Sequence, residues 1–133
     1  TYRGGEICAV AKDKDGREIA RNSLVTAGDD TYLSVLPEKT QVRNGQIAFV
    51  KLDYTDANGV VKPLNRKKVK VSVKGGKLLA VGNACPYNEE GYNGDSTYTY
   101  YGRALAVVKA TGGNIEISAT DGTLSGSAEI AVI

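Results

Sequence analysis

The chain has 133 residues, of which 17 are lysine or arginine and 15 are aspartate or glutamate, so its formal net charge is +2. This length is enough for one ordinary domain with a buried core. The small net charge gives no reason to expect a nucleic-acid or membrane-surface partner. No apolar run approaches the ~20 residues that span a bilayer, so we expect no membrane insertion.

Histidine and methionine are absent from the sequence. Without histidine, the chain lacks the commonest general base and the most frequent zinc ligand, which excludes Ser-His-Asp and Cys-His catalysis. Without methionine, Thr1 is not a translation start, so we expect a processed product or a piece of a longer chain. Cys8 and Cys85 cannot complete a four-ligand zinc site without histidine. A disulfide between them stays open, but we expect two unpaired thiols, no metal and no cofactor.

The first 27 residues are predicted to form a β-hairpin. Its strands are Glu6–Lys12 and Arg17–Thr26, and its turn is at Lys14-Asp15-Gly16, because glycine tolerates positive φ. An isolated hairpin is marginally stable in water, so we expect it to pack on the rest of the chain or on a missing partner.

The two faces of the first predicted strand differ in their side chains. Ile7, Ala9 and Ala11 point one way, and Cys8 and Val10 point the other way. If the first set contacts the remaining strands, Cys8 and Val10 are left exposed, and a partner normally covers them.

Residues 28–133 are predicted to form an immunoglobulin-like β-sandwich of about seven strands, with almost no helix. Short runs rich in Val, Ile, Thr and Tyr, which are typical of strands, lie between regularly spaced turn signals. These signals are Asn44-Gly45, Asn58-Gly59, Gly75-Gly76, Gly112-Gly113 and Asp121-Gly122, in addition to Asp15-Gly16 in the hairpin.

Apolar and polar residues alternate with period two in several of these runs, which places the apolar side chains on one face of a strand. The alternation is clear in 68–74, 114–120 and 127–132. In Ala48–Asp56 it places Val50, Leu52 and Tyr54 inward, and Lys51 and Asp53 outward. The run Ala104–Ala110 is apolar on both faces, which indicates a central strand covered on both sides or one pressed against a neighbour.

A basic run between Lys62 and Lys77 holds seven cationic residues and no acidic one. It is compatible with a surface for nucleic acid or an anionic polysaccharide. However, Lys68, Lys70 and Lys74 alternate along one strand, where lysines form a solvated face, and the run lacks aromatic residues that would stack on bases. We therefore expect no nucleic-acid partner.

Five of the eight tyrosines gather in one stretch: Tyr87, Tyr92, Tyr98, Tyr100 and Tyr101. A tyrosine ring offers an apolar face and a hydroxyl, which suits both protein interfaces and sugar-binding platforms. Three interpretations stay open: packing along a strand and over a sheet edge, contact with another domain, and carbohydrate binding.

Two further patterns carry no site. Glu89 and Glu90 are adjacent in a polar loop, so they cannot face each other across a substrate at the ~5–10 Å that glycoside hydrolysis needs. Asp13-x-Asp15-Gly16 has the start of a calcium loop but lacks the remaining ligands. We expect no catalytic residue.

Two segments resemble a known family. Gly5–Gly28 reads GEICAVAKDKDGREIARNSLVTAG, and Thr99–Val108 reads TYYGRALAVV. Together they resemble the C-terminal end of family 2 glycoside hydrolases of the β-galactosidase type. Gln46–Asp56 is similar to the first long strand of the last domain in that family, and Asn58-Gly59-Val60 to its hairpin turn.

The resemblance implies that residues 1–27 are the tail of a preceding domain plus a linker, and that 28–133 are a non-catalytic accessory module. Its partners would be other domains of the parent hydrolase, with polysaccharide as an alternative partner. A parent of this kind is expected to be bacterial and periplasmic or extracellular. The alternative functions are a carbohydrate-binding module that uses the Tyr87–Tyr101 region and an immunoglobulin-like repeat of a bacterial surface adhesin.

Overall fold

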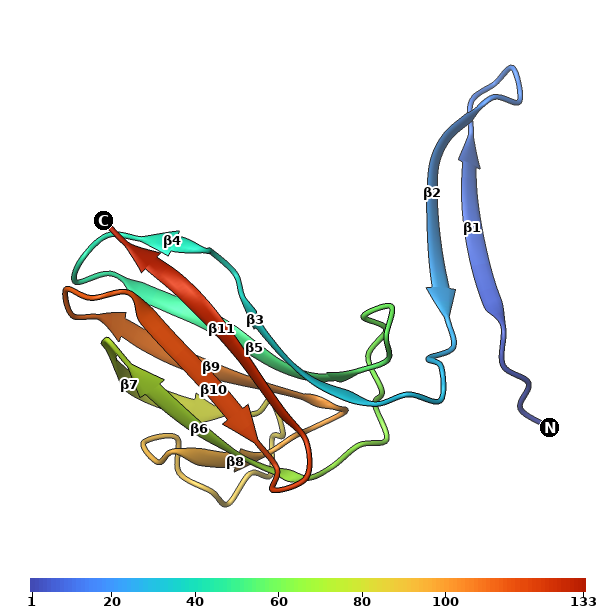
Figure 1. Ribbon diagram of the computed structural model, residues 1–133. Helices are drawn as coiled ribbons and strands as arrows, with labels where there is room; N and C mark the ends of the chain where they lie inside the picture. The colour runs from blue at the N-terminus through green and yellow to red at the C-terminus, as the bar shows by residue number, and fades with distance from the viewer.

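The computed structural model describes all residues from Thr1 to Ile133 and contains eleven strands and no helix. No segment therefore meets the requirements of a membrane-spanning helix. The strands form three sheets, of which one is a separate hairpin and two stack on each other as a sandwich (Figure 1). The predicted all-β, immunoglobulin-like fold class is confirmed.

The two sheets of the sandwich hold nine strands. The four-stranded sheet has the order β3 (Tyr32–Pro37), β5 (Ile47–Thr55), β9 (Arg103–Ala110) and β7 (Gly76–Gly82). The five-stranded sheet has the order β4 (Gln41–Val42), β11 (Ser125–Val132), β10 (Ile115–Thr120), β6 (Lys68–Lys74) and β8 (Ser96–Tyr98). All neighbours are antiparallel except β4 and β11, which are parallel. The expected number of about seven was too low, because β4 and β8 are too short to show alternation.

A cluster of 18 buried residues fills the space between the sheets. The predicted inward residues Val50, Leu52 and Tyr54 all belong to it and are fully buried. Each aliphatic side chain removed from water in this way contributes about 1.5–3 kcal/mol to the free energy of unfolding. The period-two alternation therefore identified the core face of β5 correctly.

Strand β9 lies between β5 and β7, so its predicted central position is confirmed. Its inward residues, Ala104 to Ala110 in alternation, are buried. The expectation that both faces are covered was wrong, since Leu105 on the outer face is 37% exposed and Val107 is only half-buried. Nothing in the chain forms a third layer over this side of the sheet.

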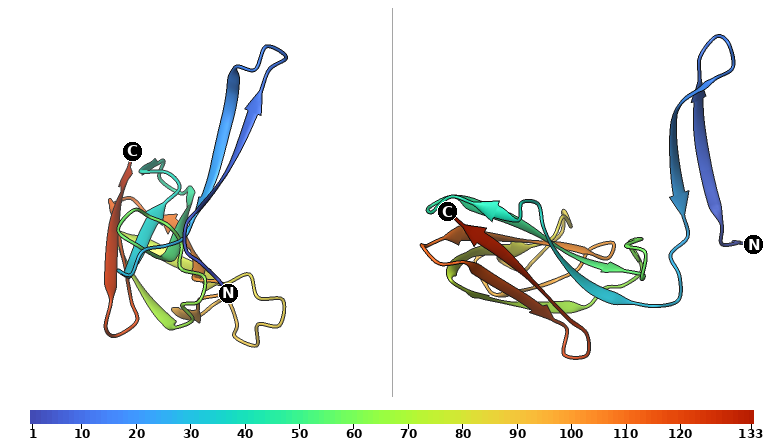
Figure 2. Two further views of the ribbon diagram at one scale, coloured as in Figure 1. Left: turned by 90° about the vertical axis from the view of Figure 1, so that its right-hand side faces the viewer. Right: turned by 45° about the horizontal axis from the view of Figure 1, so that its top comes forward.

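The hairpin consists of β1 (Glu6–Lys12) and β2 (Glu18–Val25), as predicted, and Gly16 in its turn has a φ of 81°. It projects away from the sandwich, as both views of Figure 2 show, and its strands lie against each other alone. The arrangement in which Ile7, Ala9 and Ala11 pack on the sandwich is therefore wrong. Ile7 is 75% exposed, and both faces of the hairpin meet solvent.

A network of hydrogen bonds fixes the linker between the hairpin and β3. The Lys62 ammonium donates to the carbonyls of Gly28, Asp29 and Asp30, at 2.8 Å each. The Gly28 N–H donates to Asp56 Oδ2 at 2.8 Å. The hydrogen bond from Gly28 is the main cause that lowers the pKa of Asp56. We call Asp56, Lys62 and the linker carbonyls the linker clamp.

A second anchor joins the two sheets through Tyr54 and Asp121. The Tyr54 hydroxyl donates to Asp121 Oδ2 at 2.7 Å, and the backbone N–H groups of Thr123 and Leu124 donate to Oδ1 at 2.8 and 2.7 Å. Lys67 lies 3.4 Å from the same carboxylate. Burial opposes the charged form, but these donors outweigh it and lower the pKa of Asp121 from 3.8 to about 2.

Asp121→Asn should reduce the free energy of unfolding by about 2 kcal/mol at neutral pH, because the native carboxylate has a lowered pKa. The ionised Asp121 carboxylate stabilises the fold at pH values above 3.8, which is its pKa in the unfolded chain. This stabilisation is lost as the pH falls through about 2, which is its pKa in the folded protein. Urea unfolding of both proteins from pH 7 down to pH ~2 should show the difference shrinking below pH ~4. A difference that does not change with pH would contradict this account of Asp121.

Candidate functional site

The outer face of the four-stranded sheet carries apolar side chains that nothing in the chain covers. Leu36, Ile47, Phe49 and Leu105 all lie there, because they alternate with core residues along β3, β5 and β9, and all are exposed. Strand pairing places Phe49 directly beside Val107. Contiguous exposed apolar surface usually marks a binding surface. This face is therefore the candidate functional site.

A groove of about 620 Å³ lies on this face, and we call it the tyrosine groove. Strands β5, β9 and β7 contribute its floor, and the segments 83–92 and 100–103 contribute its walls. Its volume is within the ~300–1,000 Å³ that is usual for small-molecule sites. Its lining includes Lys51, Asp53, Gly82, Tyr92, Tyr100, Tyr101, Arg103, Leu105 and Val107.

Tyr92 reaches the groove because its loop folds back onto β7. The Val81 N–H donates to the Tyr92 carbonyl at 2.9 Å, which holds the loop against the strand. The Tyr92 ring occupies the space that a side chain at position 82 would need, since a Cβ built on Gly82 would collide with the ring. Only glycine therefore allows this ring to approach the backbone so closely.

Tyr100 and Tyr101 enter the groove from a tight turn between β8 and β9. Tyr100 and Arg103 exchange two backbone hydrogen bonds, at 2.8 and 3.1 Å. The two central residues, Tyr101 and Gly102, have φ values of 49° and 74°, as a type I′ turn requires. The Tyr100 and Tyr101 rings pack edge to face, with centroids 4.6 Å apart. Tyr101 is the one residue other than glycine with a positive φ, and its side chain is 64% exposed.

Asp53 provides a carboxylate in the groove. The residue is only 6% exposed, yet no group of the chain hydrogen-bonds its carboxylate, and it forms no ion pair. Burial raises its pKa, and the charges of Arg103 and Lys51 oppose this shift without cancelling it. No side-chain oxygen of the chain is both fully buried and unpaired, so solvent reaches the Asp53 carboxylate from the groove.

The other two tyrosines of the predicted cluster lie outside the groove. Tyr98 is on β8 in the other sheet, where Arg66 and Lys68 lie 5.3 and 5.6 Å from its ring centroid. Tyr87 is 89% exposed in a depression next to the groove, which it shares with Tyr98 and Tyr100. The structure thus brings Tyr92, Tyr100 and Tyr101 together in the groove, whereas Tyr87 and Tyr98 line only the neighbouring depression, which Tyr100 also borders.

The basic run does not form a free cationic surface. Lys68, Lys70 and Lys74 lie on the solvent face of β6, as predicted, and pair with acidic groups of neighbouring segments. Lys68 contacts Glu90 at 2.9 Å, and this hydrogen bond lowers the pKa of Glu90. A general acid needs the opposite shift, so Glu90 is not suited to acid catalysis.

The cysteines and acidic residues form no metal site. Cys8 and Cys85 are both free, as expected. The Arg21 guanidinium donates to Cys8 Sγ at 3.1 Å on the surface of the hairpin. No group of three or more Cys, Asp or Glu residues is arranged to hold a metal ion.

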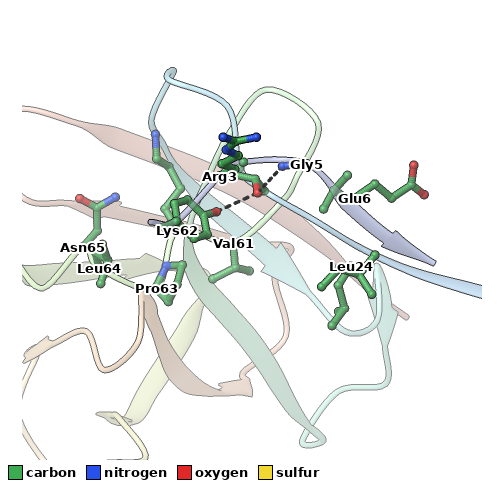
Figure 3. Close-up of a pocket in the computed structure, with 15 residues that line it drawn as sticks. Arg3, Gly5, Glu6, Leu24, Val61, Lys62, Pro63, Leu64 and Asn65 are labelled. Atoms are coloured by element: carbon green, nitrogen blue, oxygen red, sulfur yellow. Dashed lines mark hydrogen bonds between the residues drawn. The ribbon is translucent and has the colours of Figure 1, made fainter. Parts of the chain in front are cut away.

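A second pocket, of about 780 Å³, lies at the base of the hairpin. Figure 3 shows its two sides, with Leu24 of the hairpin on one and Pro63 and Leu64 of the 61–65 loop on the other. Inside the hairpin base, the Thr26 hydroxyl accepts the Gly5 N–H at 3.0 Å and contacts the Tyr2 hydroxyl at 2.8 Å. We call this the junction pocket. It shares no residue with the tyrosine groove.

Sequence and structure comparisons identify relatives of the chain. Residues 33–130 match the glycoside hydrolase family 2 C-terminal domain 5 model, which is most of the chain. The chain belongs to this family. No curated protein sequence matches it significantly.

Solved structures of family 2 enzymes contain a region similar to this family 2 domain. A glycosyl hydrolase family 2 member from Bacteroides cellulosilyticus matches 98% of the chain at 28% identity and a TM-score of 0.86. A β-glycosidase from Bacteroides vulgatus matches 98% of it at 22% identity and a TM-score of 0.86. The match spans 19% of the first protein and 18% of the second. The family 2 domain thus spans about a fifth of these larger enzymes, and the match includes the hairpin.

Several residues of the tyrosine groove were not predicted from the sequence. Asp53 was placed on the outer face of its strand, but nothing in the alternation indicated that the groove walls would cover it. The Tyr101-Gly102 pair is a two-residue turn signal that could have located the turn before β9. Gly82 carries no local signal, because its role depends on a ring ten residues away in the chain.

Gly82→Ala should cost about 1–3 kcal/mol in the free energy of unfolding, because its methyl group collides with the Tyr92 ring. It should also speed hydrogen exchange of the Val81 amide, since the loop that accepts its hydrogen bond is displaced. Gly91→Ala is the matched control, because a Cβ at Gly91 meets nothing within 4 Å. If the two variants have the same urea midpoint, Tyr92 does not pack on β7 as described.

Proposed function

We propose that this domain is a non-catalytic C-terminal module of a longer family 2 glycoside hydrolase, and that it packs against the domain that precedes it. The hairpin is the observation that carries this proposal. Its two strands pair along their whole length, but no other part of this chain packs on either face of the pair. An isolated two-stranded hairpin is only marginally stable in water.

The hairpin has one face that is suited to burial. Residues directly opposite each other in the ladder share a face, which places Ile7 with Leu24, and Ala11 with Ala20. Ile7 and Leu24 are each 75% exposed in this chain. The opposite face carries Cys8, Val10 and Val25 together with charged residues, including the Arg21–Glu18 ion pair at 2.8 Å. We expect the Ile7 face to be covered by the rest of the preceding domain.

The junction pocket supports the same arrangement. Leu64, at the tip of its loop side, is 95% exposed, and Leu24 lines the opposite side. A segment of the preceding domain that fills this pocket would bury both leucines at once, with about 1.5–3 kcal/mol for each. The linker clamp would then hold the sandwich at a fixed angle to that domain.

On this proposal, the domain contributes no catalytic group to the parent enzyme. It lacks histidine, and Glu90 is engaged by Lys68 and by the Tyr98 N–H at 3.0 Å. The work of such a module is structural: it orders the end of the parent enzyme and frames its neighbouring domains. Any hydrolysis belongs to other parts of the parent.

Cysteine labelling can test which hairpin face is buried in the parent. Cys8 reports on one face, and Ala9→Cys in a Cys8→Ser background reports on the other, with Cys85→Ser in both proteins. In the 133-residue chain, both thiols should react with a bulky reagent within minutes. In a longer protein that includes the preceding domain, the cysteine at position 9 should react more than about tenfold slower, because the Ile7 face is buried there.

The Cys8 thiol is the matched control in the longer protein, since it lies on the same strand one residue away. Its rate should fall less than the rate at position 9. Equal rates at position 9 in the short and the long protein would contradict the proposed packing of the preceding domain.

A further inference from the structure

The tyrosine groove combines two features that packing of the hairpin does not explain. One is Asp53, a nearly buried residue that lines the groove and whose carboxylate has no hydrogen-bond partner in the chain. The other is a pair of tyrosine rings held in place by an unfavourable backbone conformation at Tyr101. The positive φ at Tyr101 costs free energy in the unbound chain, and Asp53 has solvent as its only hydrogen-bond partner. Both residues line one concave site.

We propose that the tyrosine groove binds a neutral oligosaccharide, with Tyr92 and Tyr101 contacting the sugar rings and Asp53 accepting hydrogen bonds from sugar hydroxyls. This inference goes beyond the structural role proposed above and rests on different residues. It assigns a binding site to a domain that has no catalytic group.

The aromatic side of the site is pre-organised. A type I′ turn favours asparagine or glycine at the position of Tyr101, so a bulky ring there is not required by the turn. The Tyr100 ring contacts the Tyr101 ring edge to face, at an interplanar angle of 73°, and limits its rotation. Tyr92 lines the same groove, with its ring close to the backbone of Gly82. Rigid tyrosines bind with a low cost in conformational entropy and present both an apolar face and a hydroxyl.

The polar side of the site suits hydroxyl groups. Asp53 supplies acceptor atoms at the floor, and the lining residues Lys51 and Arg103 supply donors. Sugar hydroxyls both donate and accept, so one ring can use all three residues. Charge-assisted hydrogen bonds to a carboxylate are about twice as strong as neutral ones, which makes Asp53 the main polar contact.

A sugar can form hydrogen bonds with the Asp53 carboxylate, whereas a dry protein interface cannot. An apolar protein surface laid over the groove would remove the remaining water from this carboxylate and leave a buried charge without a partner, which is strongly unfavourable. A ligand rich in hydroxyls replaces that water with hydrogen bonds. The hydroxyls of a neutral sugar can pair with Asp53, Lys51 and Arg103 alike, so we commit to neutral sugars.

The test measures binding of neutral hexasaccharides to the complete 133-residue chain. The probes are β-linked oligomers of glucose, galactose, mannose and xylose, titrated by NMR up to about 10 mM. At least one should bind with a dissociation constant of about 1 mM or tighter and shift the amides of residues 100–105. Circular dichroism of each variant verifies its fold, and sedimentation verifies that each protein is monomeric.

Three variants locate the site. Tyr101→Asn removes the ring but suits the turn, and it should weaken binding by about tenfold. Asp53→Asn keeps the shape but removes the charge, and it should also weaken binding by about tenfold. Tyr87→Asn removes an even more exposed tyrosine outside the groove and should leave the affinity unchanged.

The outcomes separate the alternatives. Loss of affinity in the two groove variants with an unchanged Tyr87→Asn supports the proposal. Absence of binding for every probe overturns it, and so does binding that Tyr101→Asn and Asp53→Asn leave unchanged. Self-association of the chain that Tyr101→Asn abolishes would identify the groove as an interface between copies and also overturn it. None of these results changes the cysteine labelling pattern, so the structural role is tested separately.

Discussion

A two-stranded hairpin has no interior in which apolar side chains can be buried, and the organisation of the whole chain follows from this constraint. Strands β1 and β2 pair at seven positions, with a register shift between Ala11 and Lys12, yet both of their faces meet solvent. The sandwich, in contrast, buries its own core of 18 residues and needs no further layer. The sandwich therefore has a core of its own and the hairpin has none, which is the reason for our proposal that a preceding domain covers the hairpin.

The linker clamp restricts the movement of the linker between the hairpin and the sandwich. The Lys62 ammonium and the Asp56 carboxylate bind consecutive backbone groups of the linker, and both come from one loop of the sandwich. A flexible linker would let the two parts rotate independently, whereas this one ties the base of the hairpin to the sandwich. The tyrosine groove lies on other residues, so a ligand could bind there without disturbing the contact with a preceding domain.

Local patterns predicted local structure well and tertiary relations poorly. Alternation located the buried side chains of β5, and turn residues located the hairpin, because both signals depend on neighbouring residues. The sequence left open whether the hairpin packs on the sandwich or on a missing partner, since its apolar face carries no information about which partner covers it. The five clustered tyrosines separated into two places, because β8 and β9 belong to different sheets. The covered carboxylate of Asp53 depends on groove walls that are distant in sequence.

Amide hydrogen exchange tests the central claim most directly, because it measures the stability of the hairpin and the sandwich in one experiment. In the 133-residue chain, amides of β1 and β2 should exchange at least about a hundredfold faster than the slowest amides of β5 and β9, since the hairpin opens locally while the core does not. In a protein that includes the preceding domain, the hairpin amides should become protected. Hairpin amides as slow as those of β5 and β9 in the short chain would show that the hairpin is an independent, stable part of this domain and would contradict the account.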